Sequence, residues 1–215
     1  MDWVNQLAKV NNKFRFQLFG RNYENLEHIY ASVQRFDPQS TGGMSEHAFN
    51  LFLNASGVFF TTQEIRSIRD QFPHSQGIEY FSFITALRQD ITQKRLATID
   101  HAFDQLSVDG KVAVATLLAR LNPLRHPHVR SLTKSPEKVA AEMETAVRGR
   151  SQDGYLSSGD FRELFLDVSA CVPFEREEFF IDLLINGFGL LEEGVSVDRL
   201  RQLEVTVFEK VRQRT

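Results

Sequence analysis

The stretch Asp37-Pro-Gln-Ser-Thr-Gly-Gly-Met-Ser-Glu-His-Ala48 decides the fold of this chain. Phenylalanines stand immediately before and after it, at positions 36 and 49. Within the stretch an aspartate comes first, a glycine sixth and an apolar methionine eighth. A glycine permits the sharp turn that such a segment needs, and apolar residues recur at helical spacing on both sides. The pattern therefore predicts one helix before this loop and a second helix after it.

This spacing is that of the calcium-binding loop of an EF-hand, but most of the ligands are missing. Such a loop supplies oxygens at alternate positions and a bidentate Glu at position 12. Here Asp37 occupies position 1, whereas Gln39, Thr41 and Ala48 occupy positions 3, 5 and 12. A single carboxylate would then have to offset the two positive charges of a bound Ca²⁺ ion. We interpret Asp37 as a cap that accepts backbone N–H groups. The alternative is a weak Ca²⁺ or Mg²⁺ site formed by Asp37, Gln39 and Thr41.

Three further copies of the same unit follow, each with an altered loop. Their apolar eighth positions are Ile78, Val112 and Leu156, which correspond to Met44 in the first loop. Within each consecutive pair, these residues are predicted to meet in a short antiparallel bridge. Phe36 to Met44 spans the eight positions of an intact loop, while the equivalent spans in loops two, three and four are six, six and nine. Because the ligands alternate along a wrap of fixed length, such changes remove the metal cage. Loop four still offers weak candidate ligands, namely Asp153, Ser157 and Asp160.

The fold class predicted from these units is all-α, with two pairs of EF-hand helix–loop–helix units forming two lobes. The predicted lobes span residues 26–90 and 95–190, joined by a linker from Arg88 to Lys94. A basic, aromatic-rich arm (1–25) precedes them, and an amphipathic helix (191–215) follows them.

The composition limits the classes of function that this chain can have. The 215 residues carry a net charge of −3, which favours neither nucleic acid nor an anionic membrane as partner. Cys171 is the single cysteine, so an internal disulfide is excluded and a cytoplasmic location is predicted. His126 and His128 lack further ligands at zinc spacing and are expected to pack on a lobe. Motifs of catalysis or of phosphate binding are absent from the sequence, and we predict no enzyme and no cofactor.

The second half resembles the calcyphosin family of EF-hand proteins. The resemblance rests on Arg125-His-Pro-His-Val-Arg-Ser131, Asp153-Gly-Tyr-Leu156, Asp160-Phe161 and Asp167-Val-Ser-Ala170, and its register extends over residues 26–190. It implies a two-lobed, all-α protein with four EF-hands and without enzymatic activity. It also implies calcium binding, with relatives in ciliated cells, although this chain departs from the family at the metal ligands.

The two ends are the candidate partner-binding segments. Each could cover a lobe of the same chain or dock on another protein. A basic helix could also meet an acidic surface such as that of tubulin. In the arm the candidate residues are Trp3, Phe14, Phe16 and Phe19, and in the C-terminal helix they are Arg199, Leu200, Arg201, Leu203, Val207 and Arg212.

The sequence thus predicts a metal-free EF-hand scaffold that binds other proteins. The predicted setting is the cytoskeleton or the axoneme of a cilium or flagellum, as a microtubule-associated component. A calcium sensor opens when the position-12 carboxylate draws its helix toward the ion, and Ala48 lacks that carboxylate. The alternative hypothesis is a calcyphosin-like calcium sensor with residual binding at loop one or loop four.

Overall fold

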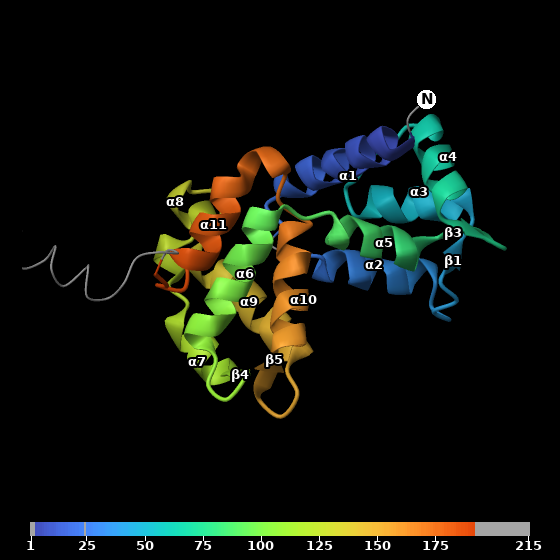
Figure 1. The fold of residues 1–215 in the computed structure, drawn as a ribbon. Helices are drawn as coiled ribbons and strands as arrows, with labels where there is room; N and C mark the ends of the chain where they lie inside the picture. The colour runs from blue at the N-terminus through green and yellow to red at the C-terminus, as the bar shows by residue number, and fades with distance from the viewer. Residues whose placement is uncertain (1–2, 24, 192–215) are drawn as a thin grey trace, which may run out of the picture.

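The computed structural model describes residues 3–23 and 25–191, which are mostly helical with short strands between helices (Figure 1). This confirms the prediction of a mainly helical protein. The predicted C-terminal helix (191–215) and its six candidate residues lie outside the described residues, apart from Leu191. In the described ranges, no helix has the length and the hydropathy that crossing a membrane requires.

The N-terminal half consists of a long first helix and two helix–strand–helix units. Its elements are α1 (Trp3–Phe19), α2 (Glu27–Phe36), β1 (Gly43–Met44), α3 (Glu46–Ala55), α4 (Thr62–Gln71), β2 (Pro73–His74), β3 (Gly77–Glu79) and α5 (Tyr80–Gln89).

The C-terminal half repeats the two units and adds a further helix after them. Its elements are α6 (Gln93–Leu106), β4 (Lys111–Ala113), α7 (Val114–Arg120), η1 (Pro123–Arg125), α8 (Pro127–Arg130), α9 (Pro136–Arg150), β5 (Tyr155–Ser157), α10 (Ser158–Ser169), η2 (Phe174–Arg176) and α11 (Glu177–Ile185).

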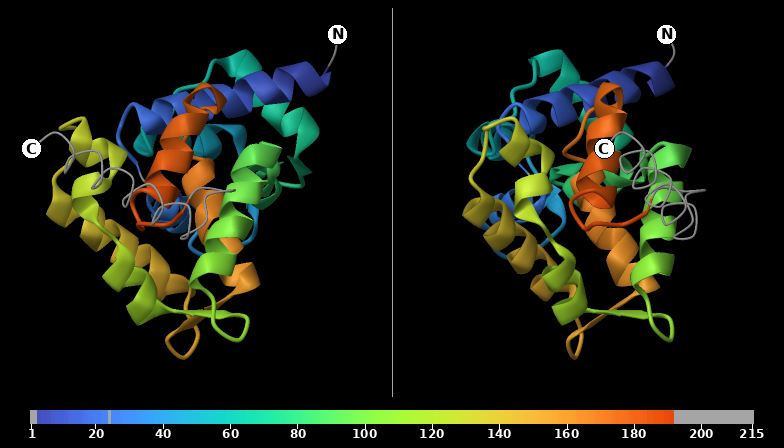
Figure 2. Two further views of the ribbon diagram at one scale, coloured as in Figure 1. Left: turned by 60° about the vertical axis from the view of Figure 1, so that its left-hand side comes forward. Right: turned by 90° about the vertical axis from the view of Figure 1, so that its left-hand side faces the viewer.

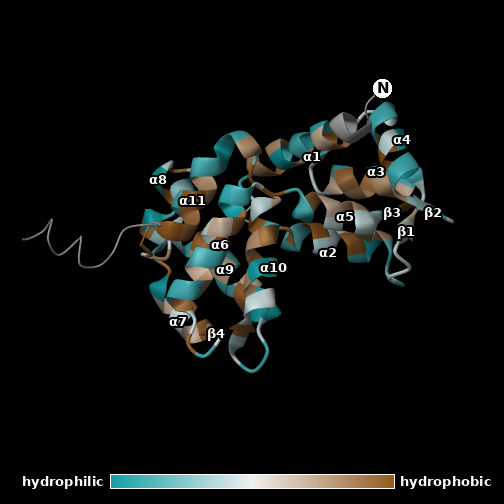
Figure 3. Ribbon diagram, viewed as in Figure 1, coloured by the Kyte–Doolittle hydropathy of each residue, from teal (hydrophilic) through white to brown (hydrophobic). Residues whose placement is uncertain are grey.

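Side-chain caps determine where many of these helices begin. The Thr61 hydroxyl accepts from the backbone N–H of Glu64, and the Glu64 carboxylate accepts from Thr61 in return, so α4 starts with a complete capping box. Ser135 caps α9, with Pro136 at the first helical position. Both helix starts follow from the sequence. Alternating hydrophobic and hydrophilic residues along the ribbons show the amphipathic character of most helices (Figure 3).

The short strands join the units in pairs. Met44 pairs with Ile78 where β1 meets β3, and Val112 pairs with Leu156 where β4 meets β5. Both pairings are antiparallel, and they are the contacts predicted for the eighth loop positions. β2 adds to the free side of β3, so the first sheet has the order β1-β3-β2.

Two hydrophobic cores lie one in each half. The first is rich in phenylalanine, and α1 contributes Val10, Phe14 and Leu18 to it. Of the two alternatives for the N-terminal arm, the described residues thus adopt the one in which it folds back on a lobe. The second core receives Phe180, Leu183 and Leu184 from α11. In each half, a helix outside the paired units therefore completes the core.

The two halves are in close contact. α5 ends at Gln89 and α6 begins at Gln93, so the connection is shorter than the predicted linker from Arg88 to Lys94. Arg88 and Lys94 themselves belong to helices. Ala170 and Cys171, which follow α10 of the second half, are buried in the core of the first half. The thiol of Cys171 is therefore buried.

Candidate functional site

In loop one, three hydrogen bonds hold one carboxylate oxygen of the single acidic candidate, Asp37. The Oδ2 atom of Asp37 accepts from the Thr41 hydroxyl at 3.1 Å, the Gly42 backbone N–H at 3.0 Å and the Tyr80 hydroxyl at 2.8 Å. Asp37 is 6% exposed. Burial raises the pKa of Asp37, but the hydrogen bonds from Thr41, Tyr80 and Gly42 outweigh this effect and hold it below its ordinary value. The carboxylate is thus stabilised as an anion by protein donors.

Tyr80 is a site residue that the sequence reasoning missed. It begins α5 in the second unit, it is fully buried, and its backbone N–H also donates to the Gly42 carbonyl at 3.1 Å. Burial and the hydrogen bond to Asp37 raise the pKa of Tyr80 above its ordinary value. The phenol therefore stays a donor at neutral pH, and it connects the two units of the first pair. A tyrosine at a helix start carries no sequence signal for this role.

The other loop-one candidates divide into two groups. Thr41 lies against Asp37, whereas Gln39 is exposed at the surface. Ala48 has no side-chain oxygen, and its backbone N–H donates to the Ser45 hydroxyl, which caps α3. Position 12 of the loop is thus an ordinary residue in the first turn of a helix.

Loops three and four are two-residue hairpins. Asp109 and Gly110 have φ of 52° and 74°, and Asp153 and Gly154 have φ of 51° and 79°. Positive φ at both central residues defines a type I′ turn, for which Asp-Gly is a favoured sequence. Two backbone hydrogen bonds close each turn, between Val108 and Lys111 and between Gln152 and Tyr155. Loop two is similarly short, because His74 pairs with Gly77 across two intervening residues.

The loop-four candidates are separated by this geometry. Asp153 is exposed in its turn. Ser157 and Asp160 lie together, but as the capping box of α10: the Asp160 carboxylate accepts from the Ser157 N–H at 3.1 Å, and the Ser157 hydroxyl accepts from the Asp160 N–H at 3.2 Å. Over the described ranges, no three His, Cys, Asp or Glu side chains lie close enough to hold a metal ion.

A buried carboxylate, Asp167 on α10, ties the halves together. Its Oδ1 atom lies 2.6 Å from Nε of Arg88 on α5 and accepts from the Tyr30 hydroxyl at 3.0 Å. Its Oδ2 atom pairs with Arg150 on α9, which also donates to Glu27 of α2 at 2.8 Å. Burial raises the pKa of Asp167, and the two arginines limit the rise. Side chains of both halves thus meet at one fully buried anion.

Two buried arginines reinforce this contact around the connection. Arg15 of α1 donates to the Leu87 carbonyl at 2.7 Å and to Oδ2 of Asp90 at 3.0 Å. Arg95 of α6 donates to main-chain carbonyls after α10, including that of Val172 at 2.8 Å. Both guanidiniums lie over the ring of Phe174. The connection between the halves is therefore fixed by charged hydrogen bonds and stacking.

The segment with His126 and His128 packs inside the protein, as the sequence analysis predicted. Both histidines are buried, and Nδ1 of His126 accepts from the His128 backbone N–H at 3.2 Å. The His128 ring lies 5.6 Å from that of Phe19 and 4.8 Å from that of Phe179. This segment therefore joins the end of α1 to α11.

The aromatic candidates of the N-terminal arm have different surroundings. Phe14 is fully buried in the first core, so its ring serves the fold of this chain and does not reach the surface. Phe19 is half-buried against Phe179 of α11, and Phe16 is 46% exposed. The side chain of Trp3 is not among those described.

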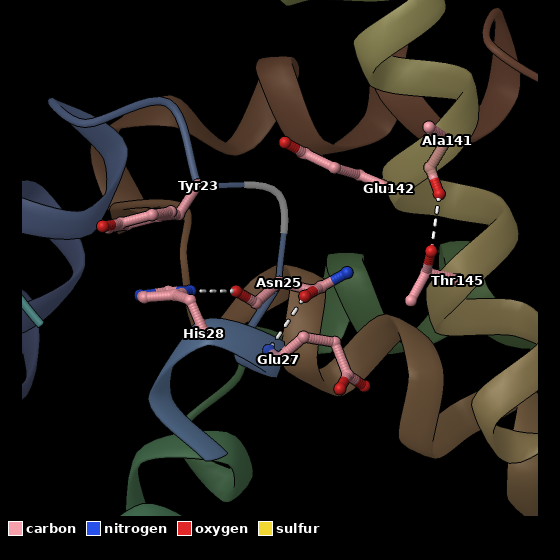
Figure 4. Close-up of a pocket in the computed structure, with 7 residues that line it drawn as sticks. All are labelled: Tyr23, Asn25, Glu27, His28, Ala141, Glu142 and Thr145. Atoms are coloured by element: carbon pink, nitrogen blue, oxygen red, sulfur yellow. Dashed lines mark hydrogen bonds between the residues drawn. The ribbon is translucent and has the colours of Figure 1, made fainter. Parts of the chain in front are cut away.

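A pocket of about 300 Å³ lies between the start of α2 and the middle of α9 (Figure 4). The rings of Tyr23 and His28 stack on one side of it, 3.4 Å apart. Nδ1 of His28 lies 3.1 Å from the Asn25 carbonyl. On the α9 side, Glu142 pairs with Lys134 at 2.6 Å. The lining residues are Tyr23, Asn25, Glu27, His28, Ala141, Glu142 and Thr145.

Burial in this pocket makes the stability of the protein pH-dependent. Burial, together with the charge of Lys134, lowers the pKa of His28 to about 4. The unfolded chain takes up a proton near pH 6.5 and the folded chain does not, so stability falls as the pH drops from 6.5 to 4. We expect a loss of about 2 kcal/mol between pH 7 and pH 5 that is absent in His28→Gln. Denaturant unfolding at both pH values measures it.

The exposed His47 on α3 supplies the control. His47→Gln should keep the pH dependence of the parent protein, because this side chain is not buried. An identical pH dependence in His28→Gln and the parent protein would contradict a neutral, buried His28.

Comparison with known proteins shows a distant similarity. No protein-family model matches the chain. The chain is 19% identical over 177 residues to crustacean calcium-binding protein 23 of Faxonius limosus, an alignment that covers 80% of this chain and 87% of that protein. This chain is thus distantly similar to a calcium-binding protein along most of its length.

Proposed function

We propose that this protein is a calcium-independent EF-hand-type scaffold, without catalytic activity, that binds other proteins. The observation that carries the proposal is the state of Asp37. This carboxylate lies where an EF-hand loop has its first metal ligand, and three protein donors already satisfy its Oδ2 atom. A cation bound to this carboxylate would find neutral or apolar side chains at positions 3, 5 and 12.

The remaining loops support the same proposal. An EF-hand loop wraps its backbone around the ion, whereas loops three and four close on themselves through two backbone hydrogen bonds each. The acids that remain there occupy a turn, as Asp153 does, or cap a helix, as Asp160 does. The units are therefore held by turn and cap interactions that need no metal.

Partner binding on such a scaffold would be constitutive. A calcium sensor exposes an apolar groove when it opens. Here α1 completes the first core and α11 the second, so the grooves of both pairs are filled from within the chain. Partners would then use the outer surface, where Phe16, Leu51 and Phe59 are exposed. As part of this proposal, the partner is a cytoskeletal or axonemal protein, as predicted from the basic ends of the chain.

A calcium sensor with residual binding is the second candidate. The similarity to a calcium-binding protein favours it. Loop one also keeps its full length, and Gly42 makes the turn with φ of 85°. The two candidates differ in a single measurable property, the affinity of loop one for calcium.

Calorimetric titration with Ca²⁺ distinguishes them. We expect no binding heat from the native sequence, and a melting temperature that is the same in chelator and in 1 mM Ca²⁺. A ligand present at a concentration equal to its Kd already adds about 0.4 kcal/mol to the free energy of unfolding. A rise of several degrees in the melting temperature on adding calcium would therefore favour the sensor. Binding at micromolar calcium would overturn the proposal.

A repaired loop serves as the positive control. The triple variant Gln39→Asp, Thr41→Asp and Ala48→Glu restores carboxylates in the loop of intact length, and it should bind calcium. A comparison variant, Ser107→Asp and Thr116→Glu, adds carboxylates at the first and last positions of loop three, beside Asp109, although this loop is two residues short. It should not bind, because its acids lie on either side of a closed hairpin.

A further inference from the structure

Helix α11 lies between α6 and α8 (Figure 2). A groove runs along each side of it. One, of about 320 Å³, separates α11 from α6, and the other, of about 410 Å³, separates α11 from α8. The residues common to both grooves are Glu178, Ile181 and Ile185, which lie along one face of α11. This face of α11 is thus a ridge with a groove on either side.

The groove between α6 and α11 has an apolar floor and a rim of both charges. Ile185 is buried at its base, Ile181 is partly exposed, and the small Ala97 is exposed on the α6 side. On the rim, Lys94 pairs with Glu178 at 2.6 Å. Such a surface suits an amphipathic helix that carries charges of both signs beside an apolar stripe.

The described chain ends at one end of this groove. The Leu191 carbonyl accepts from Nε2 of Gln105 at 2.8 Å and lies 2.9 Å from Nε2 of His101, which lines the groove. The Leu191 N–H donates to Oε1 of Gln105 at 2.9 Å. The described chain therefore ends beside α6, next to the groove.

The composition of residues 192–215 matches the groove. Their apolar residues recur at helical spacing, and their five acidic and five basic side chains correspond to the mixed charge of the rim. As a helix, 197–211 would be about 22 Å long. The groove follows α6 from Lys94 to His101, a rise of about 10 Å, so it could hold about half of such a helix. The apolar residues are Val197, Leu200, Leu203, Val207 and Val211.

We propose that residues 192–215 bind as an amphipathic helix in the groove between α6 and α11 of the same molecule. A short tether gives such a segment an effective concentration in the millimolar range, so even weak contacts keep it bound. The apolar stripe of the tail packs on Ile181 and beside Ala97. A partner that binds this stripe must first displace it from α11.

Limited trypsin digestion tests the docked state on the full chain. Basic residues of the tail, such as Arg199 and Arg201, are cleavage sites, and docking protects them because cleavage requires local opening. We expect Ala97→Glu and Ile181→Glu to speed tail cleavage about tenfold, since each places a charge in the groove. Leu51→Glu on α3, a similar change at an exposed apolar residue of the other half, should leave the rate unchanged.

Tail variants give the reciprocal test. Leu203→Asp breaks the apolar stripe and should speed tail cleavage as much as Ala97→Glu does. Gln202→Asp lies on the opposite side of the predicted helix and should not speed it. Ala97 is exposed, so its variant keeps the fold even if Ile181→Glu does not. Equal cleavage of Ala97→Glu and the native sequence would overturn the proposal. Protection that appears only at high protein concentration would also overturn it, because the tail would then be bound by a second copy.

Discussion

Replacement of Asp167 by alanine is expected to lower the free energy of unfolding by about 3–5 kcal/mol. The carboxylate is fully buried and pairs with Arg88 and Arg150 from different helices. Without it, each guanidinium would keep only a half-exposed partner, Glu163 for Arg88 and Glu27 for Arg150. The loss of one partner from a buried ionic cluster costs more than the pair contributes, because the remaining charges stay desolvated. Denaturant unfolding with a single transition measures the change.

Asp104 provides a matched control on a neighbouring helix. It is exposed on α6, and Asp104→Ala should alter stability by less than about 0.5 kcal/mol. A double variant tests whether the loss comes from leaving a buried charge without its partner. Asp167→Leu combined with Arg150→Met replaces both members of one ion pair by apolar residues, and it should recover part of the stability that Asp167→Ala loses. A loss below about 1 kcal/mol in Asp167→Ala would show that water reaches the cluster and that the halves are weakly joined.

Gly77→Ala is expected to destabilise the first pair of units by about 3 kcal/mol or more. Gly77 has φ of 139°, a conformation that L residues rarely adopt, and an added Cβ would lie 2.6 Å from the backbone carbonyl oxygen of Met44. The clash involves main chain on the paired strand, which cannot move aside as a flexible side chain could. The substitution should therefore separate β1 from β3 as well as lower the melting temperature.

Gly110→Ala is the comparison that isolates the clash. Gly110 also has positive φ, at 74°, but an added Cβ would meet nothing within 4 Å. Its cost should be about 1 kcal/mol, the backbone strain alone. Similar losses for the two variants would mean that β1 and β3 can shift apart without cost, contrary to the pairing of Met44 with Ile78.

The parts of the fold that could be predicted from sequence are those fixed by local pattern. The four apolar eighth positions define the strand pairs because side chains at that position face one another across each bridge. Capping residues such as Thr61 and Ser135 define helix starts because their hydroxyls accept the first free N–H groups.

The parts that could not be predicted depend on contacts between distant segments. Nothing near Tyr80 in the sequence indicates that its hydroxyl meets Asp37, and nothing near Arg88 indicates that it pairs with Asp167. The local pattern therefore predicts a linker that begins at Arg88, whereas Arg88 lies in α5. The form of loop four also depends on where its first helix ends. Helix α9 continues three residues past Val147 to Arg150, so Asp153 lies in a tight turn.

The insertion of Ala170 and Cys171 into the first core has a consequence for the order of folding. The first half contains its paired units by residue 90, yet its core is completed by side chains that follow about eighty residues later in the chain. At synthesis rates of about 5–20 residues per second, this leaves apolar surface open for several seconds on the ribosome. A fragment truncated before α10 would keep that surface open permanently. The two halves should therefore behave as a single cooperative unit in folding, and the isolated first half should aggregate where the whole chain stays monomeric.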